Sequence, residues 1–247
     1  RDVAPSRGLG DVYKRQGYRK VQWSIKGIFV DYNHKRRAVG KIDERYIKLQ
    51  DYKNIHNGER CFIIATGPSL TMEDIEKLKD EYTFSMNSIC KLYDQTDWRP
   101  TYFAIQDREV FDSLHKIIRK HKEVPVFIGD NIKWKNKREP EWINFPLDSM
   151  YHAYDIQIGK YHAKFSDDAY KIVYDGYSIA YSCVELAVYM GFKEIYLLGV
   201  DCTNPHDKGG HFTDNYTTKE VAETDINRIK TRMHANTLTT CLLYTSP

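Results

Sequence analysis

The stretch CFIIATGPSL, residues 61–70, decides the fold, because it predicts a buried strand that runs into a tight turn. Residues 61–65 form a short apolar run with two isoleucines and a phenylalanine, which is typical of a buried strand. Gly67 and Pro68 end that run, since glycine permits positive φ and proline has no N–H for a ladder hydrogen bond. The stretch therefore predicts the first strand and turn of an α/β domain.

The residues after this turn bear on function. Ser69 or Thr71 can cap a helix over residues 72–79, whose first turn is acidic. A strand, a glycine turn and a helix N-terminus together offer backbone N–H groups and a positive dipole end to an anion. The turn is neither a Walker A loop nor a Gly-x-Gly-x-x-Gly motif, because no Gly-Lys-Ser/Thr follows and Gly67 stands alone. On its own, the stretch is explained equally well by a turn that binds nothing.

Length and composition limit the class of protein. The 247 residues suffice for one α/β domain or two small ones, and 41% hydrophobic and 29% charged residues are ordinary for a globular chain. A net charge of +3 without a concentrated basic face argues against nucleic-acid binding. No apolar run approaches the roughly 18 residues of a transmembrane segment. The five cysteines contain no Cys-x-x-Cys pair, which predicts neither a zinc site nor disulfides and fits a reducing cytoplasm.

The two ends of the chain differ from the rest. Residues 1–16 and 241–247 resemble translated sequencing adapters and are expected not to be native, so the domain over residues 55–240 is expected to be truncated at its C-terminus. Residues 17–54 predict a helical and basic N-terminal segment that contains the run Lys-Arg-Arg at 35–37. A solvated helix face is the favoured interpretation of that run, and a membrane-surface role is the alternative. The expected location is cytoplasmic, with a membrane-peripheral alternative.

Strands alternate with helices along the middle of the chain. Strands are predicted near residues 61–66, 82–87, 101–106, 125–129 and 194–200, and further helices over residues 110–120 and 178–190. This alternation predicts an α/β, Rossmann-like, doubly wound and mostly parallel sheet. Residues 131–168 break the rhythm with many aromatic and basic residues, and we interpret them as an insertion on the substrate side of the domain.

Polar residues follow the predicted strands at their carboxyl ends. These residues are Thr66, Asn87, Asp107, Asp130 and Asp201. Any one of them is explained by the preference of Asn and Asp for turns. Five at one edge of a parallel sheet, together with helix starts at Ser69 and Ser178, favour a binding crevice there.

The same residues carry a family resemblance. Residues 61–70, Asn87, the Trp-Arg-Pro run at 98–100 with Tyr102 and Asp107, and residues 175–201 together resemble the 6-hydroxymethylpterin diphosphokinase MptE-like family. The resemblance covers roughly residues 55–216. Bacterial members of that family often occur among enzymes of polysaccharide and cell-surface glycan synthesis. The blocks are also similar to bacterial sialyltransferases that use a CMP-sugar.

The resemblance implies roles for individual residues. It implies nucleotide or phosphate binding by Thr66, Gly67, Pro68, Ser69, Asn87, Asp107, Gly176 and Ser178. His211 is the implied catalytic base, although the spacing around it departs from the sialyltransferase pattern, and Tyr216 is a candidate to steady a leaving phosphate. Asp201 is implied in catalysis, and Asp107 and Asp201 would hold Mg²⁺ if the protein is a diphosphokinase.

Three functions remain open from the sequence. The first is a transferase, most simply a glycosyltransferase-like enzyme that uses a CMP- or UDP-type nucleotide sugar and a glycan acceptor in polysaccharide biosynthesis. The second is a diphosphokinase that uses ATP with Mg²⁺ on 6-hydroxymethylpterin or a similar small alcohol. The third is a nucleotide-sugar-binding module without turnover. The first two differ in whether a metal ion is obligatory, and no cofactor is certain.

Overall fold

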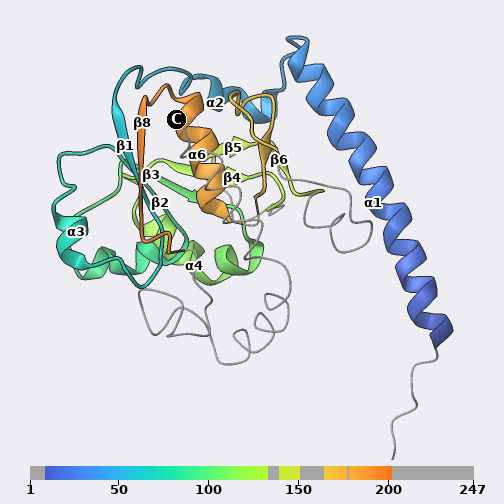
Figure 1. Cartoon of the computed structure of the whole chain (residues 1–247), viewed down its shortest axis with the longest axis horizontal. Coiled ribbons are helices and arrows are strands. Elements are labelled where there is room, and N and C mark those ends of the chain that lie inside the picture. Colours follow the sequence, from blue (N-terminus) through green and yellow to red (C-terminus); the bar gives the residue numbers. More distant parts are fainter. Residues whose placement is uncertain (1–8, 133–138, 151–163, 177, 202–247) are drawn as a thin grey trace, which may run out of the picture.

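A computed structural model of the chain describes residues 9–132, 139–150, 164–176 and 178–201. Its centre is a sheet of six parallel strands in the order β5-β4-β3-β2-β1-β8 (Figure 1). The strands are β1 (Arg60–Ile64), β2 (Thr83–Met86), β3 (Tyr102–Ile105), β4 (Val126–Gly129), β5 (Ile143–Phe145) and β8 (Glu194–Leu198). The sheet confirms the predicted Rossmann-like α/β fold, and all five predicted strands are present.

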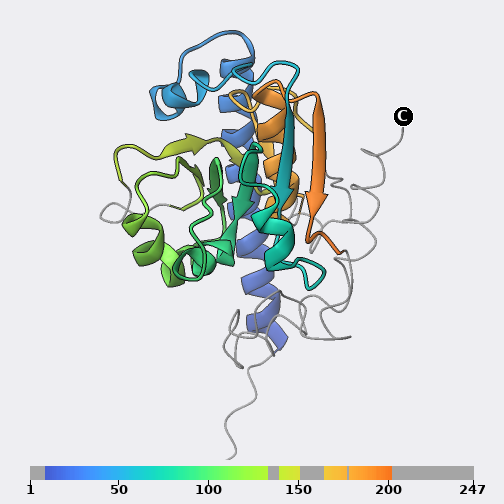
Figure 2. The same cartoon turned by 90° about the vertical axis from the view of Figure 1, so that its left-hand side faces the viewer.

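Helices cover both faces of this sheet (Figure 2). One face packs against α6 (Ile179–Tyr189), together with the short η1 (Glu44–Tyr46) and α2 (Ile47–Gln50). The other face packs against α3 (Met72–Glu76), η2 (Asn87–Asp94) and α4 (Arg108–Lys120). Burial of each large apolar side chain between these layers contributes about 1.5–3 kcal/mol, so the two-sided core accounts for the all-parallel arrangement.

Helix ends follow the sequence signals closely. The Ser178 side chain accepts a hydrogen bond from the backbone N–H of Ala180 and begins α6, as predicted. Gly191, with φ of +92°, follows the C-cap residue Met190, which agrees with the predicted helix end at residue 190. Thr71, rather than Ser69, caps α3, and the helix ends at Glu76, earlier than the sequence suggested. Beyond Glu76 the backbone hydrogen bonds change to a three-residue spacing, as between Leu78 N–H and the Ile75 carbonyl.

The region predicted as an insertion contributes a strand to the central sheet. Ile143, Asn144 and Phe145 form the edge strand β5, which pairs in parallel with β4. Directly afterwards, β6 (Leu147–Asp148) pairs in parallel with β7 (Val173–Tyr174) in a small second sheet. Strands of two and three residues are too short to produce a recognisable periodicity, which explains why the sequence did not reveal them.

The N-terminal segment forms one long helix, α1 (Leu9–Ala38), which runs along one side of the domain (Figure 1). The helix crosses the boundary that the sequence suggested between residues 16 and 17. The rest of the segment that the sequence predicts as helical and basic forms only the short helices η1 and α2. In the part of the chain that the structure describes, no helix combines the length and the apolar composition needed to span a bilayer.

Candidate functional site

The strand order places a topological switch point between β1 and β8. From β1 the chain proceeds through β2, β3, β4 and β5 to one edge of the sheet, whereas β8 pairs with the opposite side of β1. In open parallel sheets, ligands bind in the crevice outside the carboxyl ends of the strands at such a point. The turn at residues 66–69 follows β1, and residues 199–201 follow β8. The two segments that the sequence singled out therefore meet at this switch point.

Hydrogen bonds join these two segments. The N–H of Gly67 donates to the carbonyl of Gly199 at 2.7 Å. The N–H of Ser69 donates to Asp201 Oδ2 at 2.9 Å, and the Ser69 hydroxyl also donates to the Asp201 carboxylate. The carboxylate of Asp201 is consequently fixed above the turn, where it can accept further hydrogen bonds from a ligand.

Glycine is required at position 67 because the segment after β8 lies close to it, and not because of its backbone conformation. Its φ is not positive, contrary to the expectation from the sequence, and Gly199 adopts the left-handed conformation instead, with φ of +66°. A Cβ on residue 67 would lie 2.3 Å from the carbonyl oxygen of Gly199 and 2.6 Å from Asp201 Oδ2. Only glycine leaves room for the segment after β8 to lie against the turn.

The donors that the sequence assigned to a phosphate at this turn are engaged within the protein. Asp201 accepts from Ser69, and Thr71 Oγ1 accepts from the N–H of Asp74 at 3.1 Å. The carboxylate of Asp74 in turn accepts from the N–H of Thr71 at 3.2 Å, which completes a capping box. A phosphate group at Ser69 would also meet the negative charge of Asp201. The turn in this conformation therefore favours a hydroxyl donor over an anion.

A second helix N-terminus at the same edge of the sheet is better suited to an anion. Because α6 leads into the parallel strand β8, its N-terminus lies at the carboxyl ends of the strands. Ser178 caps it with a 3.3 Å bond from Ala180, and the first turn contains no acidic residue. Gly176 is buried close to Tyr181, whose ring would lie 2.5 Å from an added Cβ. The positive end of the α6 dipole is thus presented at this edge.

Asn87 and Asp107 lie at the carboxyl ends of β2 and β3. Asn87 has φ of +49°, and its Oδ1 is buried with no hydrogen-bond partner in the structure as described. Such an atom is a candidate acceptor for a ligand. Asp107 Oδ1 accepts from the backbone N–H groups of Glu109 and Val110 at 2.8 and 3.0 Å, so this side chain caps α4.

The proposed metal pair does not fit this geometry. Asp107 follows β3 and Asp201 follows β8, and β2 and β1 lie between these strands. With about 4.8 Å between neighbouring strands, their ends are roughly 14 Å apart. Two carboxylates at that separation cannot share one Mg²⁺ ion, whose ligands lie about 2.1 Å away. Among the described residues, no group of three His, Cys, Asp or Glu side chains is arranged to hold a metal ion.

Sequence reasoning missed a buried polar cluster that begins directly after β3. Gln106 is only 7% exposed, its Nε2 donates to Asp175 Oδ1 at 3.4 Å, and its Oε1 is buried with no partner among the described residues. The N–H of Asp175 donates to the carbonyl of Asp148, whose own side chain is buried. Burial raises the pKa of the Asp148 carboxyl. The signal was present, because Gln106 precedes Asp107 at the end of a strand and alternate residues point to opposite faces.

Asp130 has a structural role. Its carboxylate accepts from the hydroxyl of Tyr46 at 2.6 Å and from the N–H of Leu147 at 3.2 Å. It thereby ties the N-terminal segment to the strands that follow β4. The predicted residues His211 and Tyr216 lie outside the described residues.

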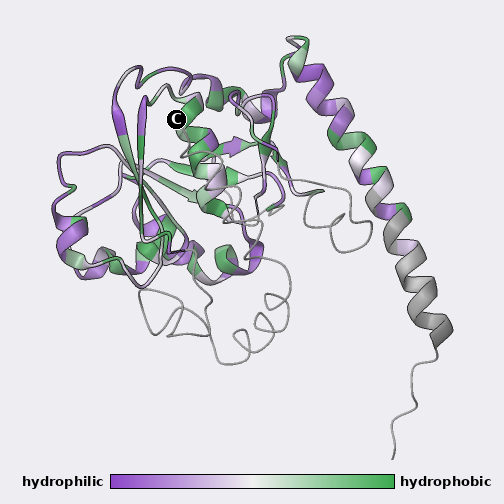
Figure 3. Ribbon diagram, viewed as in Figure 1, coloured by the Kyte–Doolittle hydropathy of each residue, from purple (hydrophilic) through white to green (hydrophobic). Residues whose placement is uncertain are grey.

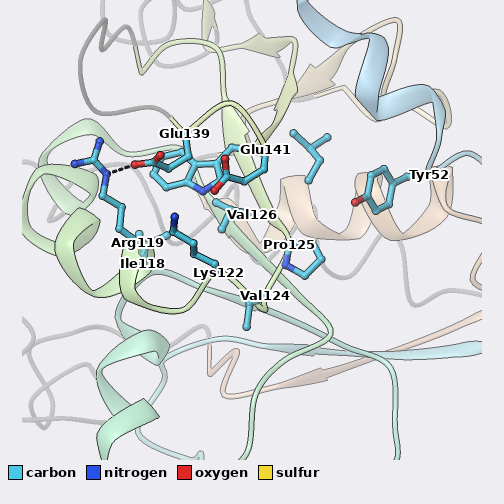
Figure 4. Close-up of a pocket in the computed structure, with 11 residues that line it drawn as sticks. Tyr52, Ile118, Arg119, Lys122, Val124, Pro125, Val126, Glu139 and Glu141 are labelled. Atoms are coloured by element: carbon cyan, nitrogen blue, oxygen red, sulfur yellow. Dashed lines mark ion pairs between the residues drawn. The ribbon is translucent and has the colours of Figure 1, made fainter.

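A pocket of about 180 Å³ lies at the opposite edge of the sheet (Figure 4). Pro125 and Val126, at the amino end of β4, contribute to its lining. Arg119 and Glu139 form a salt bridge of 2.6 Å at its rim. Pockets for ligands of drug size usually enclose about 300–1,000 Å³, so this one is small for a nucleotide sugar. It is also separated from the switch point by the length of the strands.

The fold is an α/β domain whose switch point, at the carboxyl ends of the strands, is the candidate binding site. Residues 37–207, more than half of the chain, match the family described as 6-hydroxymethylpterin diphosphokinase MptE-like. The chain belongs to this family, which confirms the resemblance drawn from the sequence.

A solved structure of another protein is similar to part of the chain. The MAf glycosyltransferase from Magnetospirillum magneticum AMB-1 shares 19% identity, with a TM-score of 0.43 over 67% of this chain and 29% of that protein. The chain thus spans less than a third of that protein's length. No curated protein matches the chain.

Proposed function

We propose that the protein is a nucleotide-dependent transferase that uses a nucleotide sugar and transfers the sugar to a hydroxyl group of a glycan. Family membership supports a nucleotide-related transferase. The donor type and the acceptor are our proposal. In such a reaction an acceptor oxygen forms a bond to the anomeric carbon, the nucleotide leaves with its phosphate, and a base takes the acceptor's proton.

One observation carries this proposal: the Asp201 carboxylate is held by Ser69 at the switch point, above a glycine that leaves room for it. A fixed carboxylate is a strong acceptor for ribose or sugar hydroxyl groups. The phosphate of the nucleotide would then lie at the N-terminus of α6, near Gly176 and Ser178, where the helix dipole favours negative charge. Asn87 Oδ1, buried without a partner in the described part of the chain, would accept from a further polar group of the nucleotide.

The base is assigned to His211, as the family resemblance implies. A neutral imidazole can take the proton of an acceptor hydroxyl near pH 7. His211→Ala would then reduce transfer without changing the affinity for the nucleotide. Equal loss of both would remove His211 from the catalytic role.

A diphosphokinase that uses ATP and Mg²⁺ is the second candidate, and the description of the family favours it. That reaction needs a hard cation between the phosphate groups. The separation of Asp107 from Asp201 counts against those two residues as a shared metal site. A metal site in this enzyme would therefore need other ligands.

Thermal unfolding in the presence of CMP, UDP, GDP, ADP and ATP, each with and without Mg²⁺, tests the choice. A ligand that binds the folded state alone raises the midpoint, by about 2.7 kcal/mol of stability at 100 times its Kd. We expect CMP or UDP to stabilise the protein without Mg²⁺. Stabilisation by ATP alone, and only with Mg²⁺, would establish the diphosphokinase instead.

Asp201→Asn sharpens this test, because it removes the charge and keeps one oxygen that can accept from Ser69. We expect CMP or UDP to bind less tightly by about tenfold, which corresponds to one charge-assisted hydrogen bond. Asp107→Asn is the matched control, since Asp107 caps α4 and lies three strands away. If both variants bind the nucleotide like the parent, the ligand does not occupy the crevice at the switch point.

A further inference from the structure

The long helix α1 exposes most of its described apolar side chains on the side that faces away from the domain. Six of them are exposed: Tyr18, Val21, Ile25, Ile28, Phe29 and Tyr32, which we call the α1 stripe. Ile28 and Phe29 are 68% and 62% exposed. Their spacing of three and four residues places all six within about 100° of the helix circumference. A single exposed apolar residue is ordinary, but an ordered stripe of six marks an interaction site.

The side of α1 that faces the domain is more polar than the stripe. Among the residues of α1 whose side chains the structure describes, the partly or fully buried ones are Gly27, Val30, Asn33, His34 and Arg37. Arg37 donates to the carbonyl of Lys171 at 2.8 Å, and Lys26 donates to Ser149 at 3.1 Å. In a surface helix that belongs to a single domain, the apolar residues would face the core. In α1 this polarity is reversed, so the stripe is not explained by packing within the described domain.

Charge indicates what kind of partner fits the stripe. The last turn of α1 contains Lys35, Arg36 and Arg37, of which the first two are exposed. The guanidinium of Arg36 lies 5.9 Å from the ring centre of Tyr32, so positive charge borders the stripe directly. Asp31 is the one acidic residue in the sequence of residues 18–38. Figure 3 shows hydrophobic positions among hydrophilic ones along this part of α1.

We propose that α1 binds the surface of an anionic lipid bilayer, with the stripe at the boundary between headgroups and acyl chains. A helix with an apolar stripe, aromatic residues and flanking Lys and Arg lies in the interface without crossing it. Tyr18, Phe29 and Tyr32 are the kinds of side chain that prefer this region. A second copy of the chain is a poorer occupant, because the single acidic residue over residues 18–38 supplies little negative charge to the same basic segment of another copy.

Co-sedimentation of the whole chain with vesicles tests this proposal. The vesicles contain phosphatidylcholine alone or phosphatidylcholine with phosphatidylglycerol. We expect the parent to bind the second kind far better and to be released by salt. Lys35→Gln should weaken binding about fivefold, which is the effect of one basic residue at an anionic surface.

A matched pair of variants separates charge from apolar insertion. Ile28→Glu places a carboxylate in the stripe, whereas Ser24→Glu adds the same charge at an exposed polar position outside it. We expect Ile28→Glu to bind at least about tenfold more weakly than Ser24→Glu, because only the former removes buried apolar area. Both positions are exposed, so both variants should fold, which far-ultraviolet circular dichroism verifies.

Three outcomes would overturn the proposal. The first is a parent that does not sediment with anionic vesicles. The second is equal binding by Ile28→Glu and Ser24→Glu. The third is a parent that forms dimers in lipid-free analytical ultracentrifugation and that Ile28→Glu converts to monomers, because the stripe would then be an interface between copies of this chain.

Discussion

Gly67→Ala is the change that most directly tests how the crevice is built. The added methyl group would lie 2.3 Å from the carbonyl oxygen of Gly199 and 2.6 Å from Asp201 Oδ2. Carbon and oxygen atoms that are not bonded rarely approach within about 3.2 Å, so the segment after β8 must move by roughly 1 Å. The nearest atom belongs to the backbone, and rotation of a side chain therefore cannot relieve this contact.

The cost follows from the bonds that this movement breaks. Displacement of residues 199–201 lengthens the hydrogen bond from Gly67 to Gly199 and the two bonds from Ser69 to Asp201. A neutral hydrogen bond contributes about 1 kcal/mol net, and a bond to a charged group about 1.5–3 kcal/mol. Partial loss of these bonds, together with residual overpacking, gives an expected destabilisation of about 3 kcal/mol. Helix and sheet content should be unchanged, since β1 and β8 pair upstream of the turn.

Urea denaturation followed by circular dichroism measures this loss, with Gly129→Ala as the matched control. At Gly129 the nearest atom to an added Cβ is the side-chain oxygen of exposed Asn131, whose rotation would cost one hydrogen bond, from its Nδ2 to the Gln106 carbonyl. We expect the control to lose less than about 1.5 kcal/mol. If Gly67→Ala is as stable as Gly129→Ala, the segment after β8 does not rest on the turn after β1. The site would then have to be sought elsewhere.

Three further changes test how the surroundings of the crevice are held. Glu185→Gln should lower the free energy of unfolding by about 1–3 kcal/mol, measured by urea denaturation. The Glu185 carboxylate accepts hydrogen bonds from the N–H groups of Ser166 and Tyr174 at 2.6 and 2.7 Å, and an amide can accept only one of them. Equal stability of the variant and the parent would contradict this anchoring role. Asp148→Asn tests a pH effect, because burial raises the pKa of the Asp148 carboxyl in the folded state. As pH rises from about 4, this carboxyl loses its proton in the unfolded chain before it does in the folded chain. The parent therefore loses stability relative to the variant over that range. Parallel curves of unfolding free energy against pH for the two proteins would refute this. Arg37→Met should detach the C-terminal end of α1 from the domain, because Arg37 is 5% exposed and donates hydrogen bonds to the Lys171 carbonyl and to Asp43. We expect faster amide hydrogen exchange over residues 30–38 in the variant. Unchanged exchange would argue against this role of Arg37.

The sequence predicted the central sheet well, because each main strand is a compact apolar run bounded by turn residues. Residues 61–65 and 194–198 illustrate this, and the helix start at Ser178 was an equally local signal. Three features escaped prediction. The first is the edge strand β5, which is too short to show an alternation of apolar and polar residues. The second is the position of α1 against the domain, which depends on contacts between residues far apart in sequence, such as Arg37 with Lys171.

The third feature concerns the site, and it shows why a local pattern can be right about place and incomplete about chemistry. The sequence placed Ser69 and Asp201 at one edge of the sheet, and the structure joins them by hydrogen bonds. A turn that follows a strand was interpreted as an anion site because its N–H groups are free in isolation. The pairing of β8 beside β1 brings a carboxylate, 132 residues away in sequence, onto those same groups. The charge at the switch point is consequently negative, so the crevice favours hydroxyl donors there, and α6 becomes the better place for phosphate. Any ligand that spans both positions would need hydroxyl groups at one end and an anion at the other, which is the pattern of a nucleotide.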